Sequence, residues 1–197
     1  GWGSLSLRMD LTPRNTVSFT VTEQGSSSPL EGATITFKQG ETVVHSAVTN
    51  SEGLAEIYIP AGDYTYSVKK VGYMAKNDIA ISINGEMSVD VEMESIPATL
   101  EITPTSFTFA ERPMETNSEP QTFTMQNIGT GTISMSRSDI TITGADADQF
   151  FLYVENNSMN LGSGQTAIFT VMFTPTSSGE KTATVKVNDN LGTIHEI

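Results

Sequence analysis

The sequence of 197 residues contains no cysteine and only two histidines, His45 and His195. Disulfide bonds, thiolate metal ligands and cysteine nucleophiles are therefore excluded. A zinc site needs three or four ligands, and neither histidine has a second histidine or a suitably spaced glutamate near it in the sequence. No Ser-His-Asp arrangement is persuasive with so few histidines. We therefore expect no catalytic residue, no metal site and no cofactor, and a structural or surface role for both histidines.

Long apolar runs are also missing. No stretch approaches the roughly 20 apolar residues that span a bilayer, so we expect no membrane insertion by this segment. The opening residues Gly1-Trp2-Gly3-Ser4 lack the charged start and apolar stretch of a signal peptide. Our expectation is an exported protein, extracellular or at the cell surface, whose signal or anchor lies outside the given sequence.

Basic residues are few, with 10 Lys and Arg against 23 Asp and Glu and a formal net charge of −13. The charge is evenly spread, with a net −6 over residues 1–95 and −7 over residues 96–197. An acidic surface repels phosphate backbones and anionic lipids. The composition thus predicts no nucleic-acid partner, and the charge itself is typical of a well-solvated surface.

Alternation of apolar and polar residues is the pattern that is present. It runs through Val17–Val21, Ala33–Phe37, Tyr64–Val68 and Met87–Met93, and again through Phe107–Phe109, Phe123–Met125, Phe169–Phe173 and Ala183–Val187. Successive side chains of a strand point to opposite faces, so each run predicts one buried and one solvated face. Helical spacing nowhere exceeds about a turn, and we expect no more than one helical turn at Asp146–Phe151. The sequence predicts an all-β protein with Tyr64 and Tyr66 in its core.

Turn-forming residues separate these runs, as in Gly25–Pro29, Asn50–Gly53 and Pro60–Asp63. Asn84-Gly85 between two alternating runs predicts a β-hairpin. Gly129-Thr130-Gly131 lacks the helix and lysine of a phosphate-binding loop, so we interpret it as a hairpin turn. Ser95–Ala98 is the expected boundary, because a strand ends before Pro97 and a new alternation starts at Leu100. We predict two tandem β-sandwich domains, residues 1–95 and 96–197.

Four motifs in the first half carry a resemblance to a known family. They are Pro29–Ile35, Thr49–Gly53, Ile59–Tyr64 and Val71-Gly72-Tyr73. With them, residues 15–95 resemble the carboxypeptidase regulatory-like domain, a transthyretin-like sandwich. The resemblance implies an accessory or stalk element whose motifs make turns and pack the core.

The second half, residues 99–197, resembles the bacterial Hydin-type immunoglobulin-like domain. The matching stretches are Leu100–Pro104, Phe123–Gly131, Ile142–Phe150 and Phe169–Pro175. The resemblance implies an immunoglobulin-like sandwich of a surface or extracellular protein. Two departures stand out: the loop Ala110–Pro120 is longer than the compact turn of the family, and the chain stops at Ile197, so we expect a short last strand.

Paired acids are the remaining candidates for chemistry. Asp146 and Asp148 could bind calcium together with Asp139 or Asp189, but no calcium-loop spacing is present and a usable site needs six to eight converging oxygens. Solvated loop acids are the alternative, and the sequence leaves a weak calcium site open. A Lys–Asn amide cross-link is not expected, because the first lysine, Lys38, already lies on the second predicted strand.

Exposed aromatic residues can anchor protein or sugar partners. Trp2, Tyr58, Tyr73 and Tyr153 are those whose facing the pattern does not decide. The loops Ala110–Pro120 and Asn156-Asn157-Ser158 are candidate presenting loops. The sequence therefore favours a non-catalytic structural or adhesion module of a bacterial surface that spaces and presents binding loops to an unidentified protein or glycan. The alternative is an accessory carbohydrate-binding module of an extracellular glycan-processing or protease system. Oligomeric state is left open.

Overall fold

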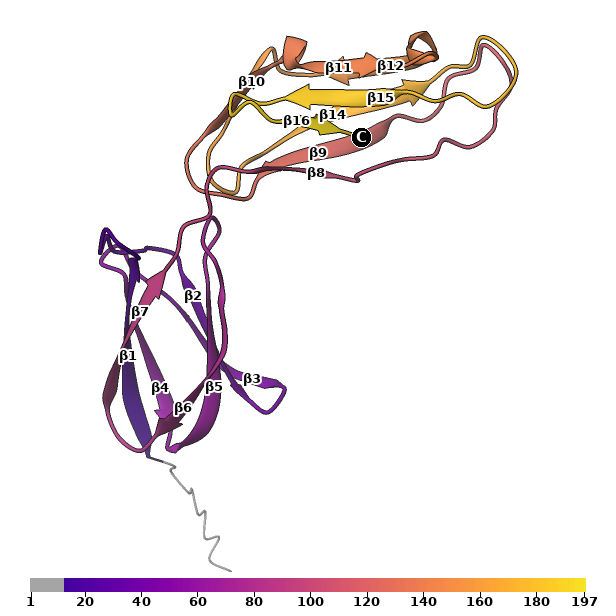
Figure 1. Cartoon of the computed structure of the whole chain (residues 1–197). Coiled ribbons are helices and arrows are strands. Elements are labelled where there is room, and N and C mark those ends of the chain that lie inside the picture. The colour runs from indigo at the N-terminus through magenta and orange to yellow at the C-terminus, as the bar shows by residue number, and fades with distance from the viewer. Residues whose placement is uncertain (1–12) are drawn as a thin grey trace, which may run out of the picture. The chain divides into compact units, whose positions relative to one another are not determined.

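The computed structural model describes residues 13–197, which form two compact units that divide after Ser95 (Figure 1). The protein is all-β, as predicted, and its helical elements in the described residues are two 3-10 turns of three residues each. No helix in this part of the chain has the length and hydropathy to cross a membrane. Trp2 lies outside the described residues.

The first unit is a sandwich of a three-stranded and a four-stranded sheet, ordered β4-β1-β7 and β3-β2-β5-β6. Strand β1 pairs antiparallel with β4 and parallel with β7. The strands are β1 (Arg14–Glu23), β2 (Thr34–Gln39), β3 (Thr42–Val48), β4 (Leu54–Pro60), β5 (Gly62–Lys69), β6 (Lys76–Ile83) and β7 (Met87–Met93).

The core of this sandwich comes from the alternation in the sequence. Val17, Phe19 and Val21 of β1 are fully buried, while the residues between them reach the surface. Phe19 packs edge-on against Phe37 and Tyr66, with ring centroids 5.7 and 5.2 Å apart. Tyr64 and Tyr66 are each 8% exposed, which confirms their predicted place in the core.

The second unit is also a sandwich, built around the four-stranded sheet β12-β14-β9-β8. Opposite it lie the pair β10-β13 and the sheet β11-β15-β16. The elements are β8 (Leu100–Thr103), β9 (Gln121–Asn127), β10 (Ile133–Ser136), η1 (Arg137–Asp139), β11 (Ile140–Thr143), η2 (Ala147–Gln149), β12 (Phe150–Val154), β13 (Ser158–Leu161), β14 (Thr166–Phe173), β15 (Thr184–Asn188) and β16 (Ile194–Glu196). The last strand is short, as expected.

Two predicted hairpins are wrong. Asn84-Gly85 joins β6 to β7, but β6 pairs with β5 and β7 pairs with β1 in the other sheet. Gly129-Thr130-Gly131 likewise joins β9 to β10, which belong to different sheets. Turn residues mark where a strand ends, whereas pairing is decided by which sheet buries the apolar face of the next strand. In both places the chain crosses between layers.

The alternation at Phe107–Phe109 also predicted a strand, and none forms between Pro104 and Pro120. A strand needs a neighbour to receive its backbone hydrogen bonds, and no neighbouring strand pairs with this segment. Phe109 is nonetheless partly buried against the core, while Phe107 remains 48% exposed. The helical turn predicted at Asp146–Phe151 is confined to Ala147–Gln149, because Phe150 and Phe151 begin β12.

Candidate binding surface

Three of the four acids considered for calcium, Asp139, Asp146 and Asp189, are held by separate local partners. Asp146 Oδ2 accepts the Thr182 N–H at 3.0 Å, and its Oδ1 lies 3.6 Å from Lys181 Nζ. Asp139 accepts the N–H and the hydroxyl of Ser136, both at 2.7 Å. These bonds lower the pKa of the Asp139 carboxyl, the backbone bond contributing most.

Asp189 is buried and bonded to His195, and Asp148 is exposed. Within residues 13–197 no three His, Asp or Glu side chains converge as metal ligands. Asp146 and Asp148 share the turn at η2, whereas Asp139 and Asp189 lie at other connections of the second sandwich.

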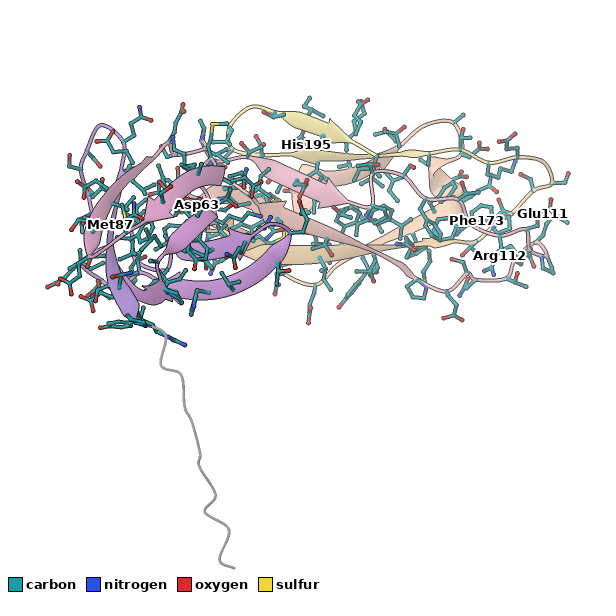
Figure 2. The ribbon with its side chains drawn as sticks, turned by 90° about the horizontal axis from the view of Figure 1, so that it is seen from below. Asp63, Met87, Glu111, Arg112, Phe173 and His195 are labelled. Atoms are coloured by element: carbon teal, nitrogen blue, oxygen red, sulfur yellow. The ribbon has the colours of Figure 1, made fainter. Side chains whose placement is uncertain are left out.

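The two histidines differ in their surroundings. His45 lies half-buried on the edge strand β3. His195 on β16 is labelled in Figure 2, and its Nε2 lies 3.0 Å from Asp189 Oδ2. Because Asp189 also accepts two backbone N–H groups of the turn before β16, this pair closes the last hairpin. For His195 this contact is structural.

The tyrosines whose facing the sequence left undecided fall into two groups. Tyr73 is partly buried, and burial together with the neighbouring Glu23 carboxylate raises its pKa. Tyr58 is 55% exposed on β4 and donates its hydroxyl to Glu56 at 3.0 Å, which raises the pKa of Tyr58. Tyr153 is 57% exposed on β12. Only Tyr58 and Tyr153 among the described candidates are therefore available to a partner.

The loop Ala110–Pro120 is tied to the end of β14. Ser118 N–H donates to the Phe173 carbonyl and Ser118 Oγ accepts the Phe173 N–H, both at 2.9 Å. Glu115 N–H donates to the Pro175 carbonyl at 2.8 Å. Figure 2 shows Glu111 and Arg112 at the end of the sandwich where Phe173 lies. The loop thus projects from a fixed base, and its Met114 is 58% exposed.

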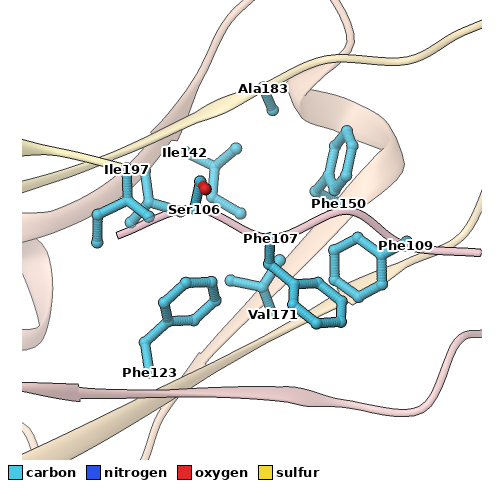
Figure 3. Close-up of a pocket in the computed structure, with 10 residues that line it drawn as sticks. Ser106, Phe107, Phe109, Phe123, Ile142, Phe150, Val171, Ala183 and Ile197 are labelled. Atoms are coloured by element: carbon cyan, nitrogen blue, oxygen red, sulfur yellow. The ribbon is translucent and has the colours of Figure 1, made fainter. Parts of the chain in front are cut away.

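An apolar cavity of about 160 Å³ opens beside the segment that failed to form a strand (Figure 3). The rings of Phe107 and Phe109 lie edge to face with centroids 4.9 Å apart, and Phe123, Phe150 and Ile142 line the cavity with them. Ser106 contributes the only hydroxyl among the lining side chains, and no ionisable side chain lines it. The cavity has no group for acid–base chemistry.

The outer face of β12 and β14 carries a group of exposed apolar side chains. Phe151 is 67% exposed, Tyr153 57% and Ile168 46%. Phe151 and Tyr153 are two residues apart on one strand, so both point to the same face, about 7 Å apart along it. Ladder partners extend the face across β14, with Met172 opposite Phe151 and Thr170 opposite Tyr153. We call Phe151, Tyr153, Ile168 and Met172 the aromatic face.

Thr122 and Thr124 of β9 continue the aromatic face with hydroxyl groups, since they pair with Thr170 and Ile168. Tyr153 was named from the sequence, whereas Phe151 was not, because it fell within a stretch in which at most one helical turn was expected. The signal that could have found it is the run Phe150–Val154, five apolar residues of strong β propensity before Glu155. Such a run on an edge strand exposes every second side chain.

The first sandwich has a match among known families: residues 16–94 match the family model of the carboxypeptidase regulatory-like domain. A comparison with curated proteins finds no match. Among solved structures, BcpA, the major pilin subunit of Bacillus cereus, is 12% identical with a TM-score of 0.39, over 93% of this chain and 67% of that one. A DUF3823 family protein of Parabacteroides merdae is 14% identical with a TM-score of 0.37, over 91% and 92% of the two chains.

The shaft pilin SpaA of Lactobacillus rhamnosus GG is 13% identical with a TM-score of 0.39, over 90% of this chain and 87% of that one. Likenesses at this level of TM-score do not bear on what the protein does. The family match over residues 16–94 agrees with the resemblance drawn from the motifs of residues 15–95. The comparison therefore supports a carboxypeptidase regulatory-like domain over residues 16–94.

Proposed function

We propose that the protein is a non-catalytic structural and binding module of an exported bacterial protein, in which the second sandwich, of the Hydin immunoglobulin-like type, presents the binding surface. One observation carries the proposal: Phe151 and Tyr153, the two aromatic side chains exposed on β12, lie side by side on the outer face of one sheet. Exposed aromatic side chains that share a face are typical anchors for partners, because they bury large areas at little entropic cost.

The disposition of the ionisable groups agrees with a binding role. The carboxylate oxygens of Asp139, Asp146 and Asp189 accept hydrogen bonds from backbone N–H groups of loops and turns. His195 is in hydrogen-bond contact with Asp189. A catalytic pair needs two titratable groups whose surroundings push their pKa values apart around a shared site. The acids Asp139, Asp146 and Asp189 instead stabilise connections between strands of the second sandwich.

The experiment is a binding screen of the full chain against surface proteins and an array of glycans, repeated with F151A/Y153A. Loss of the bound signal in this double variant supports the aromatic face as the binding surface. Y58A is the matched control, since Tyr58 is similarly exposed on an edge strand of the first sandwich. Binding that survives F151A/Y153A and falls with Y58A would place the surface on the other domain.

The loop Ala110–Pro120 is tested separately. Replacing residues 111–116 by a Gly-Ser linker of equal length removes the exposed Met114 and keeps the Ser118–Phe173 bonds that hold the base of the loop. We expect binding to weaken if the partner reaches past the aromatic face to this end of the sandwich. Unchanged binding would remove the loop from the proposed surface.

The second candidate function is carbohydrate binding within a larger extracellular system, and the aromatic face favours it. The faces of Phe and Tyr rings stack on sugar rings, and the hydroxyls of Thr122, Thr124 and Thr170 lie on the same sheet face to bond sugar hydroxyls. The acidic surface would select neutral over anionic glycans. The array separates the two candidates, because a spacing or adhesion module for proteins leaves every glycan unbound.

A further inference from the structure

Strand β12 is an edge strand with no protection against pairing. It forms a ladder with β14 alone, and its sequence Phe-Phe-Leu-Tyr-Val has no charge, no proline and no bulge in that ladder. Natural proteins blunt exposed sheet edges with such features, because a free edge is a template for another strand. An unprotected apolar edge is therefore an interaction surface for a strand of another chain.

Among the edge strands in residues 13–197, every strand of more than four residues other than β12 is protected, and so is β8. Strand β8, at the opposite edge of the same sheet, carries Glu101 in the middle of its four residues. In the first sandwich the ladder between β3 and β2 has a bulge, and the remaining edge strands carry charges: Glu56 on β4, Lys76 and Asp78 on β6, and Asp90 and Glu92 on β7. The edge strands β10, β11 and β13 also lack a charge, a proline and a bulge, but each has four residues, so β12 with five is the longest unprotected edge strand in the described part of the chain.

The backbone groups at the free edge can be assigned. Thr174 N–H donates to the Gln149 carbonyl at 2.8 Å, so the C=O group of Gln149 points toward β14. The direction of the backbone N–H and C=O groups alternates along an antiparallel strand, so those of Phe151 and Tyr153 also point toward β14. Phe150, Leu152 and Val154 then direct their N–H and C=O groups outward. The Phe150 N–H already donates to the Ala147 carbonyl at the end of η2, whereas the other outward groups of these three residues have no hydrogen bond to another part of residues 13–197.

We propose that two copies of this chain pair through β12, antiparallel and centred on Leu152. In this register Phe150 lies opposite the partner's Val154 and Leu152 opposite the partner's Leu152. The Leu152 pair exchanges two hydrogen bonds, and each Phe150–Val154 pair forms one, from the Val154 N–H to the Phe150 carbonyl, because the Phe150 N–H is already bonded to Ala147. Phe151 then lies opposite the partner's Tyr153 in the closely spaced, non-hydrogen-bonded positions, where cross-strand aromatic pairs interact best.

No like charges face each other across the proposed pair of β12 strands. In the same register Glu155 lies opposite the partner's Gln149, and Asp148 opposite the partner's Asn156, so no like charges face each other. The overall charge of −13 per copy adds long-range repulsion, which salt screens. The dimer is therefore expected to be weak at low ionic strength and to tighten as salt is added.

Edge pairing leaves the aromatic face exposed, because the two sheets join in their own plane. The four-stranded sheets of the two copies become one continuous sheet, with Phe151 and Tyr153 of both copies side by side on one surface. The inference does not depend on the proposed function. If both hold, dimerisation doubles the length of the binding surface.

The proposed register is tested by introducing charged residues at positions 151 and 153. Dimer formation of the full chain is then measured by sedimentation equilibrium at high protein concentration. The wild type is expected to show a mass that rises with concentration toward twice that of one chain. F151K/Y153K places like charges at both cross-strand positions and should weaken the dimer at least about tenfold, whereas F151K/Y153E places opposite charges there and should dimerise more tightly than F151K/Y153K. Both positions are solvent-exposed, so circular dichroism and melting should show that each variant folds.

A cross-linking experiment gives an independent answer, because the chain has no cysteine of its own. An equal mixture of F151C and Y153C should form a disulfide-linked dimer under mild oxidation, and at a higher yield than either variant alone. The control mixture pairs Y153C with Y58C, which lies on the other sandwich. A wild type that stays monomeric at all concentrations, equal behaviour of the two charge variants, or cross-linking no better than the control would overturn the proposal.

Discussion

His195 on β16 and Asp189 after β15 are joined by a 3.0 Å contact between Nε2 and Oδ2. The other oxygen of Asp189 accepts the N–H groups of Leu191 and Thr193, each at 2.9 Å. The Asp189 side chain is 2% exposed. Burial alone would raise the pKa of this carboxyl, but the bonds from His195, Thr193 and Leu191 outweigh it and hold the pKa below its ordinary value of 3.8.

A lowered pKa gives a stability contribution with a definite pH range. The folded state binds this proton less readily than the unfolded state, so the contribution is fully present above about pH 4 and is lost as the pH falls through the folded-state pKa. We therefore predict that D189N lowers the free energy of unfolding by about 1–2 kcal/mol at pH 7 and by less at pH 3. Urea unfolding of both proteins across this range measures the difference, and amide hydrogen exchange in β15 and β16 locates it. A difference that stays constant down to pH 3 would contradict the assignment.

Asn127 is predicted to be the most sensitive polar residue of the second sandwich. It is fully buried at the end of β9, and its Oδ1 accepts the N–H groups of Thr99 and Gly129 at 3.2 and 3.0 Å. Its Nδ2 donates to the carbonyls of Gly131 and Leu161 at 3.2 and 3.0 Å. One amide thus satisfies backbone groups from three separate segments of the chain.

Removing this amide leaves buried backbone groups without partners, each costing about 1–3 kcal/mol. N127A should therefore destabilise the second sandwich by about 3 kcal/mol or more, as measured by urea unfolding. N160A is the control, because Asn160 is exposed and bonds only the Ser134 hydroxyl. Similar losses in both variants would show that the amide of Asn127 has no special role.

Asn127 also illustrates how far the sequence could lead. The run from Phe123 through Gly131 was identified as a motif, and β9 with buried Phe123 and Met125 followed from alternation alone. The role of Asn127 did not, because its four partners come from segments up to 34 residues away. Strand existence is a local property of the chain, whereas hydrogen-bond partners and sheet assignment depend on tertiary contacts.

Only part of the aromatic face could be predicted from the sequence, for the same reason. Tyr153 could be named as a candidate but not placed, and Phe151 fell within the stretch Asp146–Phe151 in which at most one helical turn was expected. The structure ends that turn at Gln149, where the carbonyl accepts the Thr174 N–H and starts the ladder to β14. A contact between residues 25 positions apart in the sequence therefore decides which face Phe151 occupies.

Gly53 is predicted to be irreplaceable, whereas Gly85 is not. Gly53 has a φ of +74°, and a Cβ there would lie 2.5 Å from the carbonyl oxygen of Val21. The backbone approaches closely because Gly53 accepts the Val21 N–H at 2.8 Å. Gly85 has open space around it and no left-handed φ.

G53A should therefore destabilise the first sandwich by about 2 kcal/mol or more, through backbone strain and displacement of β1. G85A should change the free energy of unfolding by less than about 1 kcal/mol and can increase it, because alanine restricts the unfolded chain. Thermal unfolding of the two variants beside the wild type is the measurement. Equal melting temperatures for G53A and the wild type would show that the contact with Val21 is easily relieved.

Phe169 and Phe107 differ in their backbone pairing: Phe169 lies in a paired strand, and Phe107 lies in a segment that pairs with no strand. Phe169 of β14 is 1% exposed and stacks on Phe123 of β9, its ladder partner, with ring centroids 5.0 Å apart. Phe107 is 48% exposed and contacts Phe109 in a segment without strand pairing.

F169A should lower the free energy of unfolding by about 3–5 kcal/mol, because it leaves a cavity in a core that is already closed. F107A should lower the free energy of unfolding by about 1 kcal/mol or less, since it removes one wall of a cavity already open to solvent. Urea unfolding of both variants decides the point: a large loss in F107A would mean that the segment after Pro104 is part of the core in solution, as its alternating sequence first suggested.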